Sequence, residues 1–499
     1  MQGGDGGELL VVAARGGVAH APGYPLWTLL ARGFAALPVG TVAFRVTLLS
    51  ALCAAGAAAL VCRWALGKGA SPTAAMGGAL ALGLSPTFWR WGGVPEVFAL
   101  GALMAALLLV ARRPFVVGLV FGLGLSNHHT IVLCAPIAAA ALGRAPSRWL
   151  TAAAGLAVGL LPYAALALPG GAWRWGDTTT LAGLAHHFLR SDFGTFTMGG
   201  EQGAPGYARH ALGYLASWPR EWLLLAPAAA IGVLRAPLSL RASLALCLLF
   251  LCAMNVPRSD LGRAVAERFF VLPQLLTAAC VALGLDRALR ARPRLAWMLA
   301  PALAAQALLA YPRADWRRAD AVERYAEDAL RVAAPGSVIL GVGDLPLFSL
   351  LYAQEVRGLR RDVTYVDLHL LRSRWYHDRV RARLGELGAP FDARRTDTRA
   401  LVASQIRARP VYFATPAGAA ASWPGYPEGV LVRLLDGRQP APAPAEAAER
   451  LRAFRPGGGD DAWSELARGF YARAWEAVAR AREAAPLPRA PLPRKGDRQ

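Results

Sequence analysis

The feature that most constrains this chain is a series of apolar blocks, most of them long enough to cross a bilayer, separated by short hinges that contain arginine. An apolar helix of about 20 residues spans the hydrocarbon core of a membrane. Of the 499 residues, 55% are hydrophobic and only 17% are charged, a balance that a soluble enzyme of this length rarely has. The sequence therefore predicts a polytopic α-helical membrane protein.

The apolar blocks predict a transmembrane domain of about ten spans within residues 42–311. Two of the blocks, 114–126 and 129–143, are short, and a re-entrant hairpin is an alternative for this pair. The segment 169–221 is predicted to be an outer loop. The predicted spans cover residues 43–62, 72–88, 95–111, 114–126, 129–143, 149–168, 222–235, 240–255, 267–287 and 294–311.

Basic residues are concentrated in every second hinge, and this alternation predicts the orientation of the chain. Because cytoplasmic loops are enriched in lysine and arginine, we expect the N-terminus, the outer loop and the C-terminal domain on the extracytoplasmic side of a bacterial-type inner membrane. Membrane orientation explains the net charge of +21 better than a nucleic-acid partner does. The basic hinges contain Arg63, Lys68, Arg112, Arg113, Arg144, Arg148, Arg235, Arg241, Arg287, Arg290, Arg292 and Arg294, whereas the alternate hinges contain only Arg90, Arg258, Arg263 and Arg268.

Residues 1–41 are predicted to form an outer N-terminal loop followed by an interfacial helix. The segment from Tyr24 to Leu37 is apolar, is bounded by prolines and is too short to cross the bilayer, which is typical of a helix that lies on the membrane surface. The orientation requires residues 1–20 to be translocated, although they have no signal-peptide pattern. A further span upstream of Met1 is therefore expected.

A change of composition after Tyr311 predicts a small extracytoplasmic α/β domain over residues 312–438. Short apolar runs alternate there with helical patterns around 318–333 and 372–387, which indicates a mostly parallel sheet. Residues 439–499 are expected to form a Pro/Ala linker, two amphipathic helices and a disordered basic tail. The predicted strands are Ser337–Gly341, Asp362–Leu368, Pro410–Ala414 and Gly429–Leu435.

Polar residues avoid the centres of the predicted spans and collect at their outer ends. A charged side chain at the centre of a span costs about 2.5–3.5 kcal/mol, so this distribution indicates a site at the outer membrane interface. A transporter more often places polar groups near the midplane. An enzyme that acts on a lipid-attached phosphate fits better, because arginines pair with phosphate. The outer group comprises Asp5, Glu8, His20, Arg90, Glu96, Asn127, His128, His129, Arg174, Asp177, His186, His187, Arg190, Asp192, Arg263, Glu267 and Arg268.

Structural roles compete with functional ones at several of these positions. Asp5 and Glu8 also fit an acidic start of a helix, and arginines at span ends commonly reach toward head groups. His128 and His129 point to different faces of a helix, which argues against a paired metal site. All six cysteines lie in apolar blocks without metal-ligand spacing. No cofactor is therefore indicated, and a divalent metal stays an open alternative.

Several short motifs, in a fixed order, resemble the membrane family of transmembrane protein 260, a protein O-mannosyltransferase. The resemblance covers about residues 1–435. The sequence departs from the family in lacking a span before Asp5, in Leu9 where an aromatic residue is usual, and in Leu345-Pro346. The motifs are Asp5-Gly6-Gly7-Glu8, His20-Ala21-Pro22-Gly23-Tyr24-Pro25-Leu26, Ser85-Pro86-Thr87-Phe88-Trp89 with Glu96, Asn127-His128, Trp175-Gly176 with His187, Arg190, Phe193 and Gly194, Glu267-Arg268-Phe269-Phe270, and, in the C-terminal domain, Gly343-Asp344, Tyr352, Gln354, Asp362-Val363 and Arg409-Pro410-Val411-Tyr412-Phe413.

The resemblance implies a C-type glycosyltransferase fold, a polyprenyl-phosphate sugar as donor, possible transfer of mannose to a protein or glycan acceptor, and an acid in the first outer loop as catalytic base. Asp5 matches the position of that acid, and Glu8 is the second catalytic candidate. A carboxylate within about 3 Å of the acceptor hydroxyl takes its proton while the lipid phosphate leaves. The substrate-binding candidates are His20, Tyr24, Glu96, Asn127, His128, His187, Arg190, Arg263 and Arg268.

Two other functions remain open from the sequence. The number of predicted spans also suits a transporter or channel, although the midplane lacks polar groups. A membrane scaffold whose outer domain binds a partner is the third possibility. The residues alone support an outward-facing membrane site, and the resemblance supplies most of the reaction class.

Overall fold

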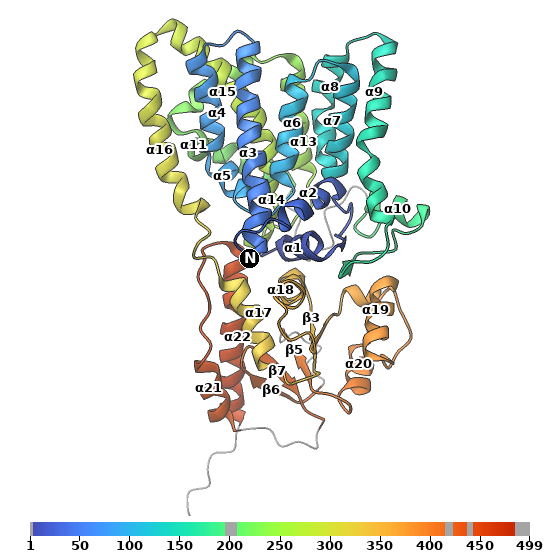
Figure 1. Ribbon diagram of the computed structural model, residues 1–499. Coiled ribbons are helices and arrows are strands. Elements are labelled where there is room, and N and C mark those ends of the chain that lie inside the picture. Colours follow the sequence, from blue (N-terminus) through green and yellow to red (C-terminus); the bar gives the residue numbers. More distant parts are fainter. Residues whose placement is uncertain (1–2, 195–206, 415–422, 437–442, 485–499) are drawn as a thin grey trace, which may run out of the picture. The chain divides into compact units, whose positions relative to one another are not determined.

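The computed structural model describes residues 3–194, 207–414, 423–436 and 443–484, which fall into two compact units (Figure 1). The first, the membrane unit, comprises Asp5–Arg318. The second, the α/β unit, comprises Ala319–Gln499 together with Met1–Gly4. Each unit has its own buried apolar residues, and each is described by itself.

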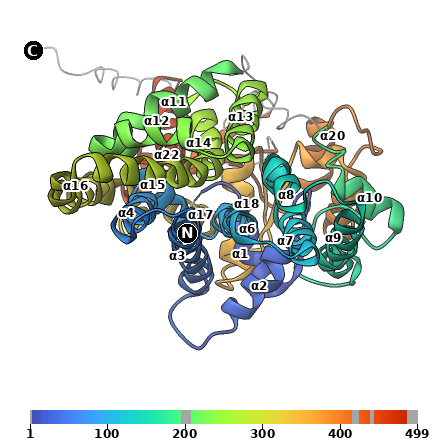
Figure 2. The ribbon, with the colours of Figure 1, turned by 90° about the horizontal axis from the view of Figure 1, so that it is seen from above.

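The membrane unit is a bundle of helices in which α9 and α16 lie at opposite edges (Figure 2). Many of its helices begin at a proline in the first turn, where the missing N–H costs no hydrogen bond and the fixed φ suits a helix. The helices are α3 (Val42–Gly67), α4 (Pro72–Gly83), α5 (Pro86–Gly92), α6 (Phe98–Val110), α7 (Pro114–Asn127), η1 (His129–Cys134), α8 (Ala135–Leu142), α9 (Pro146–Gly159), η2 (Leu161–Ala167), α11 (Ala208–Trp222), η3 (Leu223–Leu225), α12 (Ala226–Arg235), α13 (Leu238–Ala253), α14 (Asp260–Glu267), η4 (Arg268–Phe270), α15 (Val271–Ala291), η5 (Pro293–Leu295) and α16 (Ala296–Ala314).

Within the described residues, four helices are long and apolar enough to cross a membrane. They cover Val42–Gly67, Pro146–Ala167, Asp260–Ala291 and Pro293–Ala314. A fifth candidate joins Ala208–Arg235 and Leu238–Ala253, which are bent by 117°. Phe98–Val110, Pro114–Asn127 and His129–Leu142 are shorter apolar helices. Helices occupy all the segments predicted as spans. The number of spans, about ten, stays a prediction.

The predicted span 72–88 is divided between α4 and α5. The division follows from Ser85-Pro86, because a proline restricts the residue before it to extended geometry and starts a new helix. Ser85 accordingly has φ −68° and ψ 137°. The short helix α5 then leads through Gly92 and Gly93 toward Glu96.

The N-terminal segment differs from the predicted loop, because it contains the helix α1 (Gly6–Arg15), which is buried from Gly6 to Ala13. Its apolar run is too short for a span and is stabilised by packing instead. The next helix, α2 (Pro25–Ala35), occupies the segment predicted to be interfacial. Both helices lie at the same end of the bundle as α14 (Figure 1). The location of α2 at a membrane surface stays a prediction.

The predicted outer loop 169–221 contains two helices, α10 (Leu181–Phe188) and α11, so its second half differs from the prediction. The charged residues of α11 interrupt the apolar pattern on which the prediction rested, and the structure buries three polar residues of this helix, His210, Ser217 and Glu221. The first half is held by β2 (Trp173–Arg174), which pairs in parallel with β1 (Gly17–Val18). This pairing attaches the loop to the N-terminal segment.

The α/β unit contains a five-stranded sheet with the strand order β4-β3-β5-β7-β6. The three strands β4 (Thr364–Asp367), β3 (Val338–Gly341) and β5 (Val411–Phe413) are parallel, as predicted. β7 (Leu431–Leu434) and the unpredicted β6 (Gly425–Glu428) extend the sheet in antiparallel fashion. The helices of this unit up to β5 are α17 (Ala321–Val332), α18 (Asp344–Glu355), η6 (Leu370–Arg372), α19 (Arg374–Leu384) and α20 (Thr398–Gln405).

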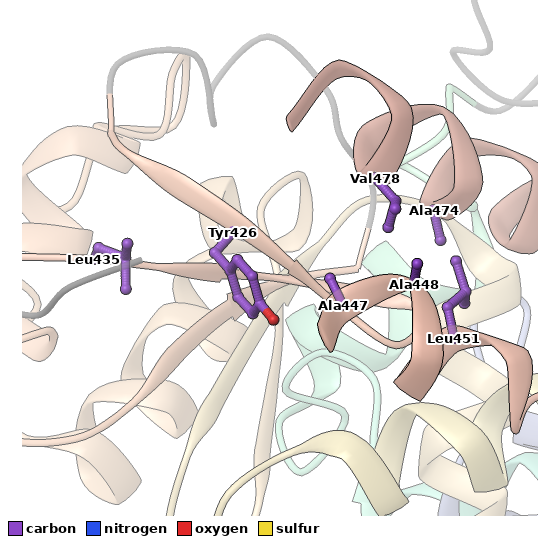
Figure 3. Packing of buried hydrophobic residues seen from close by; sticks show 7 residues of the cluster. All are labelled: Tyr426, Leu435, Ala447, Ala448, Leu451, Ala474 and Val478. Atoms are coloured by element: carbon purple, nitrogen blue, oxygen red, sulfur yellow. The ribbon is translucent and has the colours of Figure 1, made fainter. Parts of the chain in front are cut away.

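The two predicted amphipathic helices are α21 (Pro444–Arg452) and α22 (Ala462–Ala484). They pack against each other and against β6, with Leu451, Val478 and Tyr426 in the shared core (Figure 3). The predicted tail and most of the Pro/Ala linker lie outside the described residues.

Candidate active site

Asp5 lies directly before α1, and its carboxylate pairs with a distant arginine. Its side chain makes no capping hydrogen bond to the helix, so capping does not explain this acid. Instead, Arg268 Nη1 donates to Asp5 Oδ2 at 2.6 Å, and His20 Nε2 lies 3.8 Å from the same oxygen. Burial raises the pKa of Asp5, but the positive charges of Arg268 and His20 outweigh this effect and hold it below its usual value. Asp5 is therefore a carboxylate at neutral pH.

Glu8, one turn along α1, is fully enclosed and accepts three hydrogen bonds. The backbone N–H of His20 donates at 3.0 Å, His20 Nδ1 at 2.5 Å and Trp173 Nε1 at 2.8 Å. Burial lowers the pKa of His20, but the negative charges of Glu8 and Asp5 raise it by a larger amount. The pKa of His20 is therefore raised to about 9. The imidazole is therefore protonated at neutral pH, and its Nε2 donates to the Tyr24 hydroxyl at 2.8 Å.

Aromatic rings form one wall beside these charged groups. Tyr24 stacks on His128 with 5.8 Å between ring centroids and an interplanar angle of 8°. Phe98 and Phe269 pack edge to face against each other, and the Arg268 guanidinium lies 5.7 Å and 6.0 Å from their ring centroids. The apolar wall keeps water away from the guanidinium, which strengthens its ion pairs.

Glu96 is a second buried acid beside Arg268, in the connection between α5 and α6. Its Oε1 lies 3.7 Å from Arg268 Nη1, so one guanidinium serves both Asp5 and Glu96. Burial raises the pKa of Glu96 to about 7; Arg268 opposes this shift, and Asp5 adds to it. The loop that carries Glu96 is fixed by Trp27 Nε1 and Ser50 Oγ, which donate to its backbone carbonyl at 3.1 and 3.3 Å.

Three further predicted residues border this group. Asn127 is buried at the end of α7 and donates from Nδ2 to the Val97 carbonyl at 3.0 Å. The buried His187 of α10 contacts the Ala19 carbonyl through Nε2 at 3.1 Å, next to His20 in sequence. Arg190 adopts a left-handed conformation with φ 55°, and its guanidinium lies 5.7 Å from the Phe193 ring centroid. Phe193 in turn packs against His20.

The structure does not place Arg263 with these residues. Its side chain is 70% exposed and forms an ion pair with Asp260, one turn earlier on α14. His186 is likewise exposed and pairs with Asp192 at 2.8 Å, whereas His129 contacts the Tyr163 hydroxyl at 3.3 Å. Among the residues described, no group of three or more histidines, cysteines and acids is arranged to hold a metal ion.

Two residues at and near the site escaped sequence reasoning. Trp173 supplies the indole that satisfies Glu8, and its signal was an aromatic residue next to the Trp175-Gly176 motif. Glu221 is fully buried at the end of α11, where its carboxylate accepts hydrogen bonds from Thr87. The sequence feature that could have identified Glu221 is an acidic residue directly before a predicted span.

An apolar pocket adjoins the charged group on the side of His128. Its lining comes from α6, η1, α13, η4 and the start of α15, and includes Phe98, His128, Ile131, Phe250, Phe269 and Leu272. Apart from His128 and Thr130, the side chains that line it are nonpolar. This lining offers few hydrogen-bond partners, unlike that of a sugar-binding site.

Family models match both units of the chain. The model for the protein O-mannosyl-transferase TMEM260 N-terminal domain matches residues 5–149, and that for TMEM260-associated domain 2 matches residues 322–418. The mouse "Protein O-mannosyl-transferase TMEM260" is 31% identical over 445 residues, which cover 79% of this chain and 63% of the mouse protein. The Dictyostelium discoideum protein of the same name is 29% identical over 241 residues, which cover 41% of this chain and 29% of that protein. The chain thus spans less than two thirds of the length of these relatives.

A solved structure confirms the predicted fold class. The crystal structure of ArnT from Cupriavidus metallidurans in the apo state matches with a TM-score of 0.52 at 12% identity, covering 87% of this chain and 93% of ArnT. The fold is that of a polytopic C-type glycosyltransferase with a small C-terminal α/β domain. Together, the two family models and the curated relatives show that both units of this chain are similar to the transmembrane protein 260 family.

Proposed function

We propose that this protein is a membrane glycosyltransferase that transfers a sugar from a polyprenyl-phosphate carrier to an acceptor hydroxyl outside the cytoplasmic membrane, with Asp5 as the base. The observation that carries the proposal is the Asp5 carboxylate, which is 15% exposed and held at 2.6 Å by the guanidinium of Arg268. This ion pair combines an accessible base, Asp5, with a cation, Arg268, that suits a phosphate. The names of the relatives support mannose as the sugar and a protein as the acceptor.

In the proposed reaction, the acceptor oxygen attacks the anomeric carbon of the sugar and its proton passes to Asp5. The bond between that carbon and the phosphate oxygen breaks, and the lipid phosphate leaves with the electron pair. A phosphate leaves readily, so a carboxylate of low pKa is a sufficient base, because the proton moves late in the reaction. Arg268 stabilises the negative charge that develops on the phosphate.

Arg268 has three anionic partners in this scheme. Without donor it pairs with Asp5 at 2.6 Å and lies 3.7 Å from Glu96. A donor phosphate that binds Arg268 takes over part of this pairing and leaves an Asp5 oxygen available to the acceptor. Glu8 is fully enclosed and therefore holds His20 rather than contacting the acceptor directly.

The apolar pocket beside His128 supports a lipid-linked donor. Because its wall includes Phe98 and Phe269, which also pack around Arg268, a hydrocarbon chain in the pocket places its phosphate near the guanidinium. Burial of apolar surface then contributes about 25 cal/mol per Å² to donor binding. The extracytoplasmic side and the bacterial-type inner membrane belong to the same proposal, through the distribution of basic hinges.

The test is sugar transfer in native membranes by the full reading frame, including any upstream span. Wild type and Asp5→Asn are compared across a panel of polyprenyl-phosphate sugars, and Asp260→Asn serves as a control because Asp260 is exposed on α14. The proposal expects transfer by wild type and by the control, and donor binding without transfer by Asp5→Asn. Equal transfer by wild type and Asp5→Asn would remove Asp5 as base. An absence of transfer and donor binding in wild type would overturn the whole function in favour of a transporter or a scaffold.

A further inference from the structure

Glu221 is a fully buried acid in the membrane unit, outside the group around Asp5. Its Oε2 accepts the backbone N–H of Thr87 at 3.0 Å, and its Oε1 accepts the Thr87 hydroxyl at 2.7 Å. Thr87 is the second residue of α5, so the carboxylate satisfies a backbone donor that the helix itself leaves unpaired. A negative charge at this position also interacts favourably with the helix dipole.

The helix that Glu221 holds leads directly to a residue of the candidate site. α5 ends at Gly92, and Glu96 follows four residues later. α5 also contacts η4, the turn that begins with Arg268. The position of α5 therefore determines where Glu96 lies relative to Arg268.

A second connection runs from Glu221 to Arg268 through ion pairs. Arg220 Nη2 lies 3.1 Å from Glu221 Oε1 and 3.5 Å from Glu267 Oε1. Glu267 is the residue before Arg268, which pairs with Asp5. Glu221 thus connects to the Asp5 pair by two routes: α5 and Glu96 form one, and Arg220 and Glu267 form the other.

The backbone of Glu221 is fixed as well. The buried Gln306 of α16 donates from Nε2 to the Glu221 carbonyl at 2.5 Å and to the Ala81 carbonyl at 3.0 Å. Removal of one partner from a buried charged network leaves the other groups uncompensated. A buried carboxylate is costly unless a positive charge lies beside it. Within the described part of the chain, Arg220 supplies that charge to Glu221. If the charge of Glu221 is removed, Arg220 loses this ion pair.

We propose that Glu221 is a positioning residue that sets the start of α5 and the Arg220–Glu267 pair, so that Glu96 and Arg268 keep their places beside Asp5. The inference rests on the proposed function, because its effect is on that transfer reaction. Glu221 touches neither donor nor acceptor. Because Arg268 acts most strongly on the charge that develops on the leaving phosphate, the loss of Glu221 lowers the rate of the reacting complex more than the affinity for the donor.

The experiment compares Glu221→Gln with three other variants of the full chain in native membranes or nanodiscs. Glu221→Gln keeps the shape of the side chain and removes its charge. Thr87→Val removes the hydroxyl, and Thr87→Ser keeps it. Asp286→Asn is the matched control: Asp286 also accepts a hydrogen bond at a helix start, from the Ser71 N–H at 2.7 Å, and pairs with Arg290, but it lies at the opposite, predicted cytoplasmic end of the span 267–287.

Two measurements are made on each variant: kcat and KM for sugar transfer, and hydrogen exchange of residues 86–96 and 260–268. The inference expects Glu221→Gln and Thr87→Val to lower kcat about 10-fold with KM for the donor within about 2-fold, and to speed exchange in residues 86–96. Glu221→Gln also speeds exchange in residues 260–268. Thr87→Ser and Asp286→Asn behave as wild type in both segments and in kcat.

An unchanged kcat in Glu221→Gln would overturn the inference, as would an equal fall in kcat in Asp286→Asn. A Glu221→Gln variant that fails to fold leaves Thr87→Val against Thr87→Ser as the deciding pair, because that pair differs in the hydroxyl that Glu221 accepts. If wild type transfers no sugar, the proposed function fails by that result, and hydrogen exchange alone decides whether Glu221 positions the two segments.

Discussion

Arg268 Nη1 and Asp5 Oδ2 lie 2.6 Å apart although 263 positions separate the two residues in the chain. Both side chains are about 15% exposed, so the pair faces a small opening and is only weakly screened by solvent. The same guanidinium lies 3.7 Å from Glu96, which joins the N-terminal segment, the α5–α6 connection and η4 at one point.

The first prediction compares Arg263, which lies within α14, with Arg268, which directly follows this helix. Arg268→Gln is expected to lower kcat/KM for transfer at least about 100-fold, because it removes the cation that stabilises the leaving phosphate. Arg263→Gln is expected to remain within about 2-fold of wild type, because its ion pair with Asp260 is exposed. Initial rates at subsaturating donor measure both. Equal losses in the two variants would contradict the assignment of Arg268.

The second prediction concerns the pH dependence of the His20–Glu8 pair. The folded pKa of His20 is raised to about 9, because Glu8 and Asp5 outweigh the effect of burial. The stability that protonated His20 contributes to the folded protein is then complete below the usual histidine pKa of about 6.5, and it is lost as the pH rises through about 9. Tm in nanodiscs between pH 6 and 10 tests this. The difference in Tm between wild type and His20→Asn should become smaller at high pH. The Tm of the exposed His186→Asn variant should stay close to that of wild type at every pH. A gap that is constant across the range counts against the pairing.

The third prediction concerns Glu96, whose pKa is raised to about 7 by burial. The folded protein then holds a proton that the unfolded chain releases near pH 4.5, so the stability due to Glu96 falls as the pH rises from about 4.5 through 7. Glu96→Gln should therefore raise Tm relative to wild type at pH 8, and the gain should be much smaller at pH 5. The exposed Asp260→Asn variant should show no such difference. A gain that is the same at both pH values would contradict the raised pKa.

The fourth prediction concerns the indole of Trp173. Trp173→Phe removes one of the three hydrogen bonds to the enclosed Glu8 carboxylate and should cost about 1–3 kcal/mol of stability. Trp149→Phe is the control, because its indole bonds to the Gly143 carbonyl in an exposed position. Chemical denaturation in nanodiscs compares the two. A smaller loss for Trp173→Phe than for Trp149→Phe would mean that Glu8 does not depend on this donor.

The fifth prediction concerns the β1–β2 pair. Gly17 has φ 121°, and a Cβ atom there would lie 1.6 Å from the Trp173 carbonyl oxygen. Gly17→Ala should therefore separate the two strands and lower both Tm and transfer. Gly33→Ala has open space around it within α2 and should be neutral or slightly stabilising. Thermal melts and transfer rates of the two variants test this, and a wild-type result for Gly17→Ala would show that the strands are not closely paired.

Sequence reasoning identified most of the helical segments, because apolar blocks of span length are rare outside membrane helices. It also placed β3, β4, β5 and β7 to within two residues at each end. It predicted loops where the helices α1, α10 and α11 lie. Short apolar runs with flanking glycines or charges resemble loops when their packing partners are unknown. It missed β6 because Gly425 and Pro427 are unfavourable in strands, and only pairing with β7 explains them.

The candidate site was predictable as a set of residues but not as a set of contacts. The polar residues at the outer ends of the spans were visible, whereas the pairing of Asp5 with Arg268, and of Glu8 with His20 and Trp173, depends on long-range packing. Arg263 and Arg268 were both predicted to bind substrate, since both are arginines of the same predicted outer hinge. The structure separates them: Arg263 extends from α14 into solvent, whereas Arg268 begins η4 between two phenylalanine rings.

The parallel pairing of Gly17–Val18 with Trp173–Arg174 implies that the charged group exists only in a nearly complete membrane unit. A fragment that ends at residue 149, the limit of the first matched domain, would contain Asp5, Glu8 and His20 but lack Trp173 and Arg268. During synthesis, more than a hundred further residues therefore follow the two N-terminal acids before Trp173, one of the donors to Glu8, and Arg268, the counter-charge of Asp5, emerge. Any truncated or split form of the protein must supply both pieces together to regain the site.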